Sequence, residues 1–307
     1  MKEGKSIINQ GPCDVLGNFP EENSLIIEKL QQAVPLIVFH RGAKGASIAE
    51  NTAKSIHIAN LLGADIVEID VVRSIDGDYF LFHDGEEPQH FGLSRNICEL
   101  STAEIYKLSY KWHSDPDKMF YGVEPLDTVR NFDKTIFNVD RSWWYWPDLL
   151  EILASFNMTN QLLMKSHVGN KELHALASTP VKFPYIAIVR TMAEVEEVMA
   201  RPEINTIGFE LLAHTDEDEF ADKAAVQEIR EQGYAVQLNA LNLSNRNPLY
   251  RGWDDEASLL GSPELGWGKL IDQGADLVQT DWPSLLRDYR AQRELPAVFP
   301  SDALVQP

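Results

Sequence analysis

The chain has 307 residues, 44% of them hydrophobic, which suffices for one large core, and we expect one main domain. Its net charge of −20 excludes proteins that bind nucleic acid or anionic membranes through a basic surface, since the long-range field would repel both. The two cysteines, Cys13 and Cys98, are too few for a disulfide framework.

No apolar run approaches the ~18 residues of a membrane span, so we expect no stable membrane insertion. The polar N-terminal residues are not followed by a signal-peptide core. We therefore expect a cytoplasmic protein, or a secreted or periplasmic one if a leader has been removed before this sequence.

Short apolar runs alternate with helical patterns along the chain, which is typical of a parallel sheet built from βα units. An amphipathic helix at 23–33 comes first, and we place it over the lower end of the fold. The expected strands are 36–40, 66–72, 136–140, 161–165, 185–189, 206–211, 235–240 and 276–280. Eight such units predict an α/β fold, a closed (β/α)8 TIM barrel.

A hairpin arm at 79–83 follows the second strand. The Asp-Gly pair at 76–77 is typical of a tight hairpin turn, so the arm should run antiparallel to the strand before it. Glu68 and Asp70 are two residues apart, so their carboxylates share one face of the strand, and His83 should lie near them. Burying two anions side by side is costly without a cation, so this pattern predicts a hard divalent metal ion.

Helix start and stop signals occupy the gaps between the expected strands. The segments 101–104 and 191–194 have the capping-box pattern of a hydroxyl residue followed three positions later by Glu. Gly63 and Gly274 each end a helix just before a strand.

The expected main domain covers residues 34–294. It contains one long insertion and has a flanking segment at each end. Residues 1–33 form an N-terminal extension with one helix. Residues 85–130 are the longest excursion, which we interpret as an elaborated loop above the active face. Residues 295–307 contain three prolines and indicate a tail, or an assembly arm in a homo-oligomer.

Polar residues stand at the ends of most expected strands. In a TIM barrel the active site lies at the C-terminal strand ends. A single polar residue there is usually a helix cap, but the collective pattern predicts a catalytic site. His167, two residues beyond Lys165, is a further candidate. The strand-end set is His40, Arg41, Asp140, Lys165, Glu210, Gln237, Asn239 and Asp281.

Several of these residues belong to a recognisable series of motifs. In chain order they are His40-Arg41-Gly42, Glu50-Asn51-Thr52, Glu68-Ile69-Asp70-Val71, Asp76-Gly77, His83-Asp84 and, near the end, Thr280-Asp281-Trp282-Pro283. In order and spacing, the chain resembles the glycerophosphodiester phosphodiesterase family over residues 36–290. The resemblance implies a phosphatidylinositol-phospholipase-C-like barrel and a divalent cation, Mg²⁺ or Ca²⁺. It also implies hydrolysis of a small-molecule glycerophosphodiester to an alcohol and a phosphomonoester, in lipid or glycerol metabolism.

The resemblance assigns the catalytic histidines to His40 and His83 and the metal ligands to Glu68, Asp70 and Asp140. The chemistry agrees, because hydrolysis of a phosphodiester requires charge neutralisation, an activated oxygen nucleophile and protonation of the leaving alkoxide. Carboxylates suit a hard divalent ion, and two imidazoles can supply the proton transfers. The residues leave open which histidine is the base and which the acid.

Five further residues are expected to bind the substrate. Arg41 can clamp a phosphate oxygen and Lys165 can add a point charge to the same group. Asn51 is expected to donate a hydrogen bond to a phosphate oxygen or to a catalytic histidine. Trp143, the first of four successive aromatic residues, either packs under the next helix or offers a stacking surface for the substrate alcohol. Asn239 is expected to face the same site from its strand end.

Departures from the family pattern leave other reactions open. Ala49 stands where the family usually has proline, and Asp140 and Ser142 stand where it has Glu followed two residues later by Lys. Arg141 or Lys165 would then replace the missing cation. An Asp at this strand end is also similar to sphingomyelinase-D-like relatives, so the alternatives include a lyase that leaves a cyclic phosphate and phosphoryl transfer to a sugar. A non-catalytic phosphodiester-binding protein is disfavoured, because binding alone needs no acid–base pair.

Overall fold

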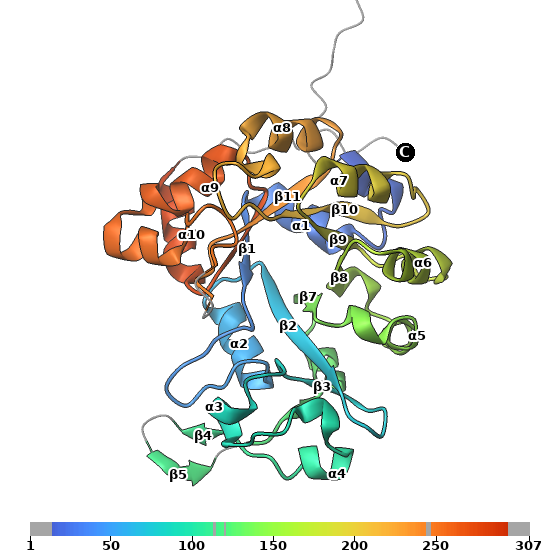
Figure 1. The fold of residues 1–307 in the computed structure, drawn as a ribbon, viewed down its shortest axis with the longest axis vertical. Coiled ribbons are helices and arrows are strands. Elements are labelled where there is room, and N and C mark those ends of the chain that lie inside the picture. Colours follow the sequence, from blue (N-terminus) through green and yellow to red (C-terminus); the bar gives the residue numbers. More distant parts are fainter. Residues whose placement is uncertain (1–13, 113–114, 120, 244–246, 294–307) are drawn as a thin grey trace, which may run out of the picture.

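The fold is described here by a computed structural model, which covers residues 14–112, 115–119, 121–243 and 247–293 (Figure 1). Cys13, most of the N-terminal extension before the first helix, and the expected tail at 295–307 lie outside the described residues.

Eight parallel strands form a closed barrel with helices around it (Figure 1). Strand β1 pairs with β2 on one side and with β12 on the other, which closes the ring. The predicted (β/α)8 barrel is thus confirmed, and the strand bounds differ from the expected ones by at most two residues. In barrel order the strands are β1 (Leu36–Phe39), β2 (Ile66–Arg73), β7 (Ile136–Asp140), β8 (Leu162–His167), β9 (Tyr185–Val189), β10 (Thr206–Leu211), β11 (Ala235–Asn239) and β12 (Leu277–Thr280).

Helices cover the outside of the barrel. They are α1 (Ser24–Gln32), α2 (Ala53–Leu61), α5 (Asp148–Ser155), α6 (Asn170–Ser178), α7 (Met192–Met199), α8 (Lys223–Glu231), α9 (Trp267–Gln273) and α10 (Pro283–Gln292). Helix α7 begins at the predicted capping box, in which the Thr191 hydroxyl accepts the Glu194 N–H and the Glu194 carboxylate accepts the Thr191 N–H. Gly274 ends α9 with a φ of 115°, a left-handed conformation that favours glycine.

Short helical turns connect many of these elements. Turns of 3₁₀ type lie at Asp14–Asn18, Ile97–Glu99, Leu126–Asn131, Trp143–Tyr145, Thr159–Gln161, Glu219–Ala221 and Pro263–Leu265, and a π-helical turn lies at Ala257–Gly261. No helix in the described ranges is both long enough and apolar enough to span a bilayer.

The side chains inside the barrel change from apolar to polar along the strands. At the lower, N-terminal end, an apolar cluster includes Val38, Ile66, Leu163, Ile186 and Leu277, and Ile26 and Leu30 of α1 pack into it. Because alternate residues of a strand face the same side, the next inward positions are His40, Glu68, Lys165, Ile188 and Gln279, which line a cavity. The lower end is therefore sealed, and polar groups face the upper opening.

Strand β2 extends beyond the barrel and carries the predicted hairpin arm. Strand β3 (Tyr79–Leu81) pairs antiparallel with β2, and β6 (Glu124–Pro125) pairs with β3. The insertion between β3 and β6 contains α3 (Glu87–Phe91), α4 (Thr102–Ile105), β4 (Lys111–Trp112) and β5 (Asp115–Met119), and it lies at one end of the molecule (Figure 1). Described residues of this segment pack around Phe80, Phe82 and Ile97 in an apolar cluster separate from that of the barrel.

Candidate active site

A cavity of about 250 Å³ lies at the C-terminal ends of the barrel strands. Its wall includes every residue assigned a catalytic, metal-binding or substrate-binding role from the sequence except Asn51, whereas Gln237 and Asp281 of the strand-end set do not line it. The assigned residues that line it are His40, Arg41, Glu68, Asp70, His83, Asp140, Trp143, Lys165 and Asn239. The barrel thus brings together side chains that are up to about two hundred positions apart in the sequence.

Glu68 and Asp70 are buried at the wall of this cavity, 1% and 2% exposed. The register of β2 and β7 places Asp70 opposite Asp140. Burial raises the pKa of Glu68 well above its usual value, and the neighbouring Asp70 and Asp140 carboxylates raise it further. This side of the cavity is therefore a region of concentrated negative charge.

Two residues with left-handed backbone conformations hold the carboxylates in place. Arg41, with a φ of 57°, donates its backbone N–H to Glu68 Oε2 at 2.7 Å. Asn51, with a φ of 55°, donates from Nδ2 to Asp70 Oδ2 at 2.9 Å and accepts the Asp70 N–H at 2.9 Å. The Asn51 amide is thus engaged with Asp70, where we had expected a bond to a phosphate oxygen or a histidine.

Lys165 forms an ion pair with Asp140 on the neighbouring strand. Its Nζ lies 2.6 Å from Asp140 Oδ2 and 3.2 Å from Glu210 Oε2. Burial lowers the pKa of Lys165, but the two carboxylates more than offset this and hold the pKa above its usual value. Glu210 also accepts hydrogen bonds from Gln237 and Asn239, at 2.8 and 2.9 Å. Lys165 is therefore charged and neutralised within the protein.

The carboxylate oxygens at the cavity differ in whether they already accept a hydrogen bond or form an ion pair. Within the described residues, no three His, Cys, Asp or Glu side chains form a ready-made metal site. Asp140 has one oxygen on Lys165 and the other on the Arg141 backbone N–H at 2.7 Å. Glu68 Oε1 and Asp70 Oδ1, in contrast, accept no hydrogen bond from the residues that the structure describes. Unpaired oxygens on buried carboxylates are the hard donors that Mg²⁺ and Ca²⁺ prefer, so the donor set fits such an ion.

His40, directly after β1, is oriented by Asp281, directly after β12. His40 Nδ1 lies 3.0 Å from Asp281 Oδ1, and Lys44 Nζ lies 3.0 Å from the same oxygen. We assign the proton to Nδ1 because its partner is a carboxylate, which leaves Nε2 as the basic nitrogen. Burial lowers the pKa of His40, although Asp281 raises it in part, so the imidazole is neutral near pH 7.

Asp255 anchors the segment that carries Asp281. Its carboxylate accepts hydrogen bonds from the Trp267 indole N–H at 2.7 Å, the Thr280 hydroxyl at 2.6 Å and the Asp281 N–H at 2.8 Å. Asp255 lies in a connection between strands and belongs to none of the motifs, so no sequence pattern pointed to it.

His83 lies two residues beyond β3. The ladder continues past the strand, since the Phe82 N–H donates to the Asp70 carbonyl at 3.1 Å, and this brings His83 beside the carboxylates. His83 Nδ1 is buried without a hydrogen-bond partner in the described part of the chain. Asp84 pairs with Arg141 at 2.6 Å and so ties the hairpin to the end of β7.

Arg41 and Trp143 have several contacts within the protein. Arg41 Nη1 lies 2.8 Å from Glu50 Oε1, and Arg41 Nε lies 3.3 Å from Asp70 Oδ2. The Trp143 ring is 8% exposed and packs edge-on against His167, with 5.4 Å between ring centroids. Trp143 therefore packs into the fold and lines the cavity at the same time, and the roles of both residues in substrate binding stay predictions.

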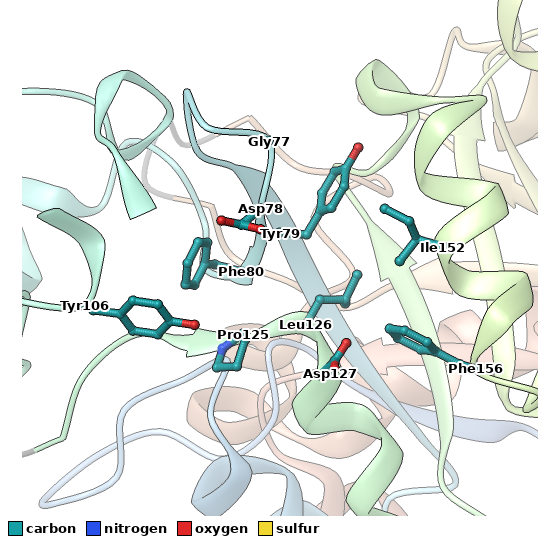
Figure 2. A pocket seen from close by; sticks show the side chains of 10 residues that line it. All are labelled: Gly77, Asp78, Tyr79, Phe80, Tyr106, Pro125, Leu126, Asp127, Ile152 and Phe156. Carbon is teal, nitrogen blue, oxygen red and sulfur yellow. The ribbon is translucent and has the colours of Figure 1, made fainter. Parts of the chain in front are cut away.

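A second cavity, of about 310 Å³, lies outside the barrel beside the hairpin. Figure 2 shows Phe80 of β3 and Tyr106 on one side of this cavity, and Ile152 of α5 with Phe156, directly after α5, on the other. None of the predicted catalytic or metal-binding residues lines it. The cavity at the strand ends is therefore the candidate active site.

Comparison with protein families agrees with the motif series. Residues 40–234 match the glycerophosphoryl diester phosphodiesterase family. The chain belongs to this family. The resemblance inferred from the motifs is thereby confirmed, and the protein is a glycerophosphodiester phosphodiesterase. Residues 185–290 also match a domain of unknown function. No curated protein matches the chain.

Solved structures of phosphodiesterases share the fold at low sequence identity. A glycerophosphoryl diester phosphodiesterase from Parabacteroides distasonis has a TM-score of 0.68 and 17% identity, covering 88% of this chain and 93% of its own. One from Thermotoga maritima has a TM-score of 0.59 and 22% identity, covering 83% and 97%. An Oleispira antarctica phosphodiesterase, solved with the product sn-glycerol-3-phosphate, has a TM-score of 0.59 and 22% identity, covering 83% and 96%.

Proposed function

We propose that this glycerophosphodiester phosphodiesterase uses His40 and His83 as its acid–base pair and a divalent cation to release an alcohol and a phosphomonoester. The observation that carries the proposal is the Asp281-oriented His40 in one cavity with His83 and three carboxylates. The phosphomonoester in the Oleispira structure, which has the same fold, supports a product of this kind.

In this proposal His40 is the general base. Its neutral Nε2 can take a proton from the attacking oxygen, because Nδ1–H is held by Asp281. The Asp281 carboxylate then stabilises the imidazolium that forms, as carboxylates do in other His–Asp pairs. His83, which lines the same cavity, donates a proton to the leaving alkoxide.

We further propose that Glu68, Asp70 and Asp140 hold Mg²⁺ or Ca²⁺, as enzymes of this family generally use a divalent metal. When bound, such an ion supplies neutralisation of the phosphate charge and polarisation of its P–O bonds. The burial of Glu68 beside two other carboxylates supports this, since buried carboxylate oxygens without a partner are costly in a protein interior.

The test is hydrolysis of glycerophosphocholine by the purified enzyme with Mg²⁺ or Ca²⁺, followed by ³¹P NMR. We expect sn-glycerol-3-phosphate as product and loss of activity when a chelator removes the metal. His40→Ala and His83→Ala should each lower kcat about 10²–10⁴-fold, because each removes one proton-transfer group. Thermal unfolding of both variants should stay close to that of the wild type.

The matched control is His57→Ala, which removes an exposed histidine on α2 and should leave kcat unchanged. A cyclic phosphate in the ³¹P spectrum would identify a lyase and contradict hydrolysis. Near-normal turnover in either catalytic-histidine variant would contradict the acid–base assignment.

A further inference from the structure

The cationic side chains that line the cavity are not equivalent. There are four of them among the described residues, Arg41, Arg141, Lys165 and Arg190. Three are neutralised within the protein, Arg41 by Glu50 at 2.8 Å, Arg141 by Asp84 at 2.6 Å and Lys165 by Asp140 at 2.6 Å. The Arg190 guanidinium has no carboxylate within ion-pair distance in the part of the chain that the structure describes.

The acidic residues that cap the start of α7, directly after Arg190, are already engaged. Glu194 Oε2 accepts the backbone N–H groups of Arg190 and Thr191, at 2.5 and 3.2 Å, as part of the capping box of α7. Glu219 accepts the N–H of Met192 at 3.1 Å. These carboxylates satisfy the first backbone donors of the helix, and the exposed guanidinium of Arg190 remains available to a ligand.

Arg190 lies across the opening from the proposed base. It follows β9, where Ile186 belongs to the inner apolar cluster and Ile188 lines the cavity, so Arg190 is the next residue on the same inward face. In the ring of eight strands, β9 is the fourth strand from β1 in either direction. A group bound at Arg190 is therefore on the far side of the cavity from His40.

The part of the cavity wall formed by β9 and by the segments after β10 and β11 differs from the catalytic wall. It carries the aliphatic side chains Ile188, Leu212, Leu241, Leu243 and Leu249. His167 stands on the neighbouring strand and contacts Trp143 edge-on. This apolar wall suits the carbon skeleton of an alcohol, and the arginine at its rim suits a terminal anion.

We propose that Arg190 binds a second anionic group, a carboxylate or a phosphate, on the alcohol of the phosphodiester, so that the enzyme prefers phosphodiesters of anionic alcohols. The inference rests on the proposed function and names the substrate class of the same site. A guanidinium can bind either anion through two parallel hydrogen bonds. In a chain with a net charge of −20, such a substrate needs a local cation that the protein has not already neutralised.

The decisive experiment uses glycerophosphoserine and glycerophosphoethanolamine, which differ by one carboxylate. We expect the wild-type enzyme to have the higher kcat/KM for glycerophosphoserine. Arg190→Gln should lower the ratio of kcat/KM for serine over ethanolamine about 10–100-fold, mainly through KM, because a charge-assisted contact is lost. Arg190→Lys should recover part of the ratio, since it keeps the charge and loses the fork.

A second pair, bis(glycerophospho)glycerol and glycerophosphoglycerol, differs by a phosphodiester and separates the two anion sources. If Arg190→Gln lowers the kcat/KM ratio of glycerophosphoserine over glycerophosphoethanolamine, the site binds carboxylates. If it lowers the kcat/KM ratio of bis(glycerophospho)glycerol over glycerophosphoglycerol, the site binds phosphates. Arg201→Gln, which removes the same charge just beyond the other end of α7, is the matched control and should change neither ratio.

Two results would overturn the inference in different ways. If Arg190→Gln slows both members of each pair equally, Arg190 acts on the group common to all four substrates and not on the alcohol. If the wild-type enzyme hydrolyses none of these four substrates and does not hydrolyse glycerophosphocholine, the proposed function is wrong, and the proposed substrate class is wrong as well.

Discussion

Asp281 is the residue on which the orientation of His40 depends. Its Oδ1 contacts both His40 Nδ1 and Lys44 Nζ, each at 3.0 Å, and these contacts lower the pKa of Asp281 to about 2 although burial raises it. The carboxylate is therefore ionised at every pH at which the enzyme is expected to work. It can hold one tautomer of the imidazole throughout that range.

We predict that Asp281→Asn lowers kcat about 10²-fold or more, because an amide neither fixes the Nδ1–H tautomer as firmly nor stabilises the imidazolium. The pH profile should also move. A base works when neutral, so activity falls as the pH drops through the pKa of His40. Asp281 raises that pKa, so its removal should shift the acid limb of kcat/KM to lower pH.

The measurement is kcat/KM between about pH 4 and pH 8 for both enzymes. If Asp281 had a purely structural role, its substitution would lower kcat without shifting the acid limb of the kcat/KM profile. A shift of the limb to higher pH would contradict the arrangement described for His40 and Asp281.

Lys165 resolves a question that the sequence left open. Asp140 and Ser142 depart from the Glu-x-Lys pattern, and Arg141 and Lys165 were both candidates for the missing cation. In the structure Arg141 pairs with Asp84, and Lys165 contacts Asp140. The cation is thus supplied from the neighbouring strand, a replacement that a pattern within one strand cannot reveal.

At the scale of elements, α1 acts as a cover for the lower end of the barrel. Ile26 and Leu30 are 1% and 2% exposed and pack against Leu36 and Ile66, which begin two barrel strands. The cavity lies at the opposite end of those strands, on the far side of the apolar cluster. Substitutions in α1 should therefore change the stability of the fold without changing catalysis.

We predict that Leu30→Ala lowers the free energy of unfolding by about 2–5 kcal/mol, because it opens a cavity in a close-packed cluster, and leaves kcat unchanged. Urea unfolding and a standard activity assay would test this. Glu28→Ala, an exposed position on the same helix, is the control and should change the free energy of unfolding by less than about 0.5 kcal/mol. A loss of kcat in folded Leu30→Ala would show that the two ends of the barrel are coupled.

Most elements could be predicted because their signals are local. Short apolar runs between helical patterns marked the eight strands, and the capping box at Thr191 marked the start of α7. The end of β1 was less predictable, since the chain leaves the strand at His40 and Arg41 takes a φ of 57° to donate its N–H to Glu68. The expected strand therefore ran one residue too far.

At the scale of the whole molecule, the net charge of −20 acts against the anionic substrate of this enzyme. A negative field slows the approach of an anion, and salt screens that field over about 10 Å at 0.1 M ionic strength. Three of the four cations in the cavity wall are neutralised by carboxylates, so they offset little of the field at a distance.

We predict that kcat/KM for glycerophosphoglycerol, a monoanion, rises about two- to threefold between roughly 10 and 200 mM NaCl at saturating divalent cation, because salt screens the repulsion. Glycerophosphocholine has no net charge and is the matched control, for which we expect little change. A fall in kcat/KM for the anionic substrate would mean that attraction by local cations outweighs the field of the whole molecule.

By itself, the sequence determined the barrel, its hairpin arm and the family, since apolar runs, turn dipeptides and motif spacing are properties of short segments. Only the tertiary structure decided which charges are paired. His40 and Asp281 are 241 positions apart and Arg141 and Asp84 are 57 apart, so no local pattern links them. The same holds for Arg190, since among the described residues the fold gives the other three cations carboxylate partners and gives Arg190 none.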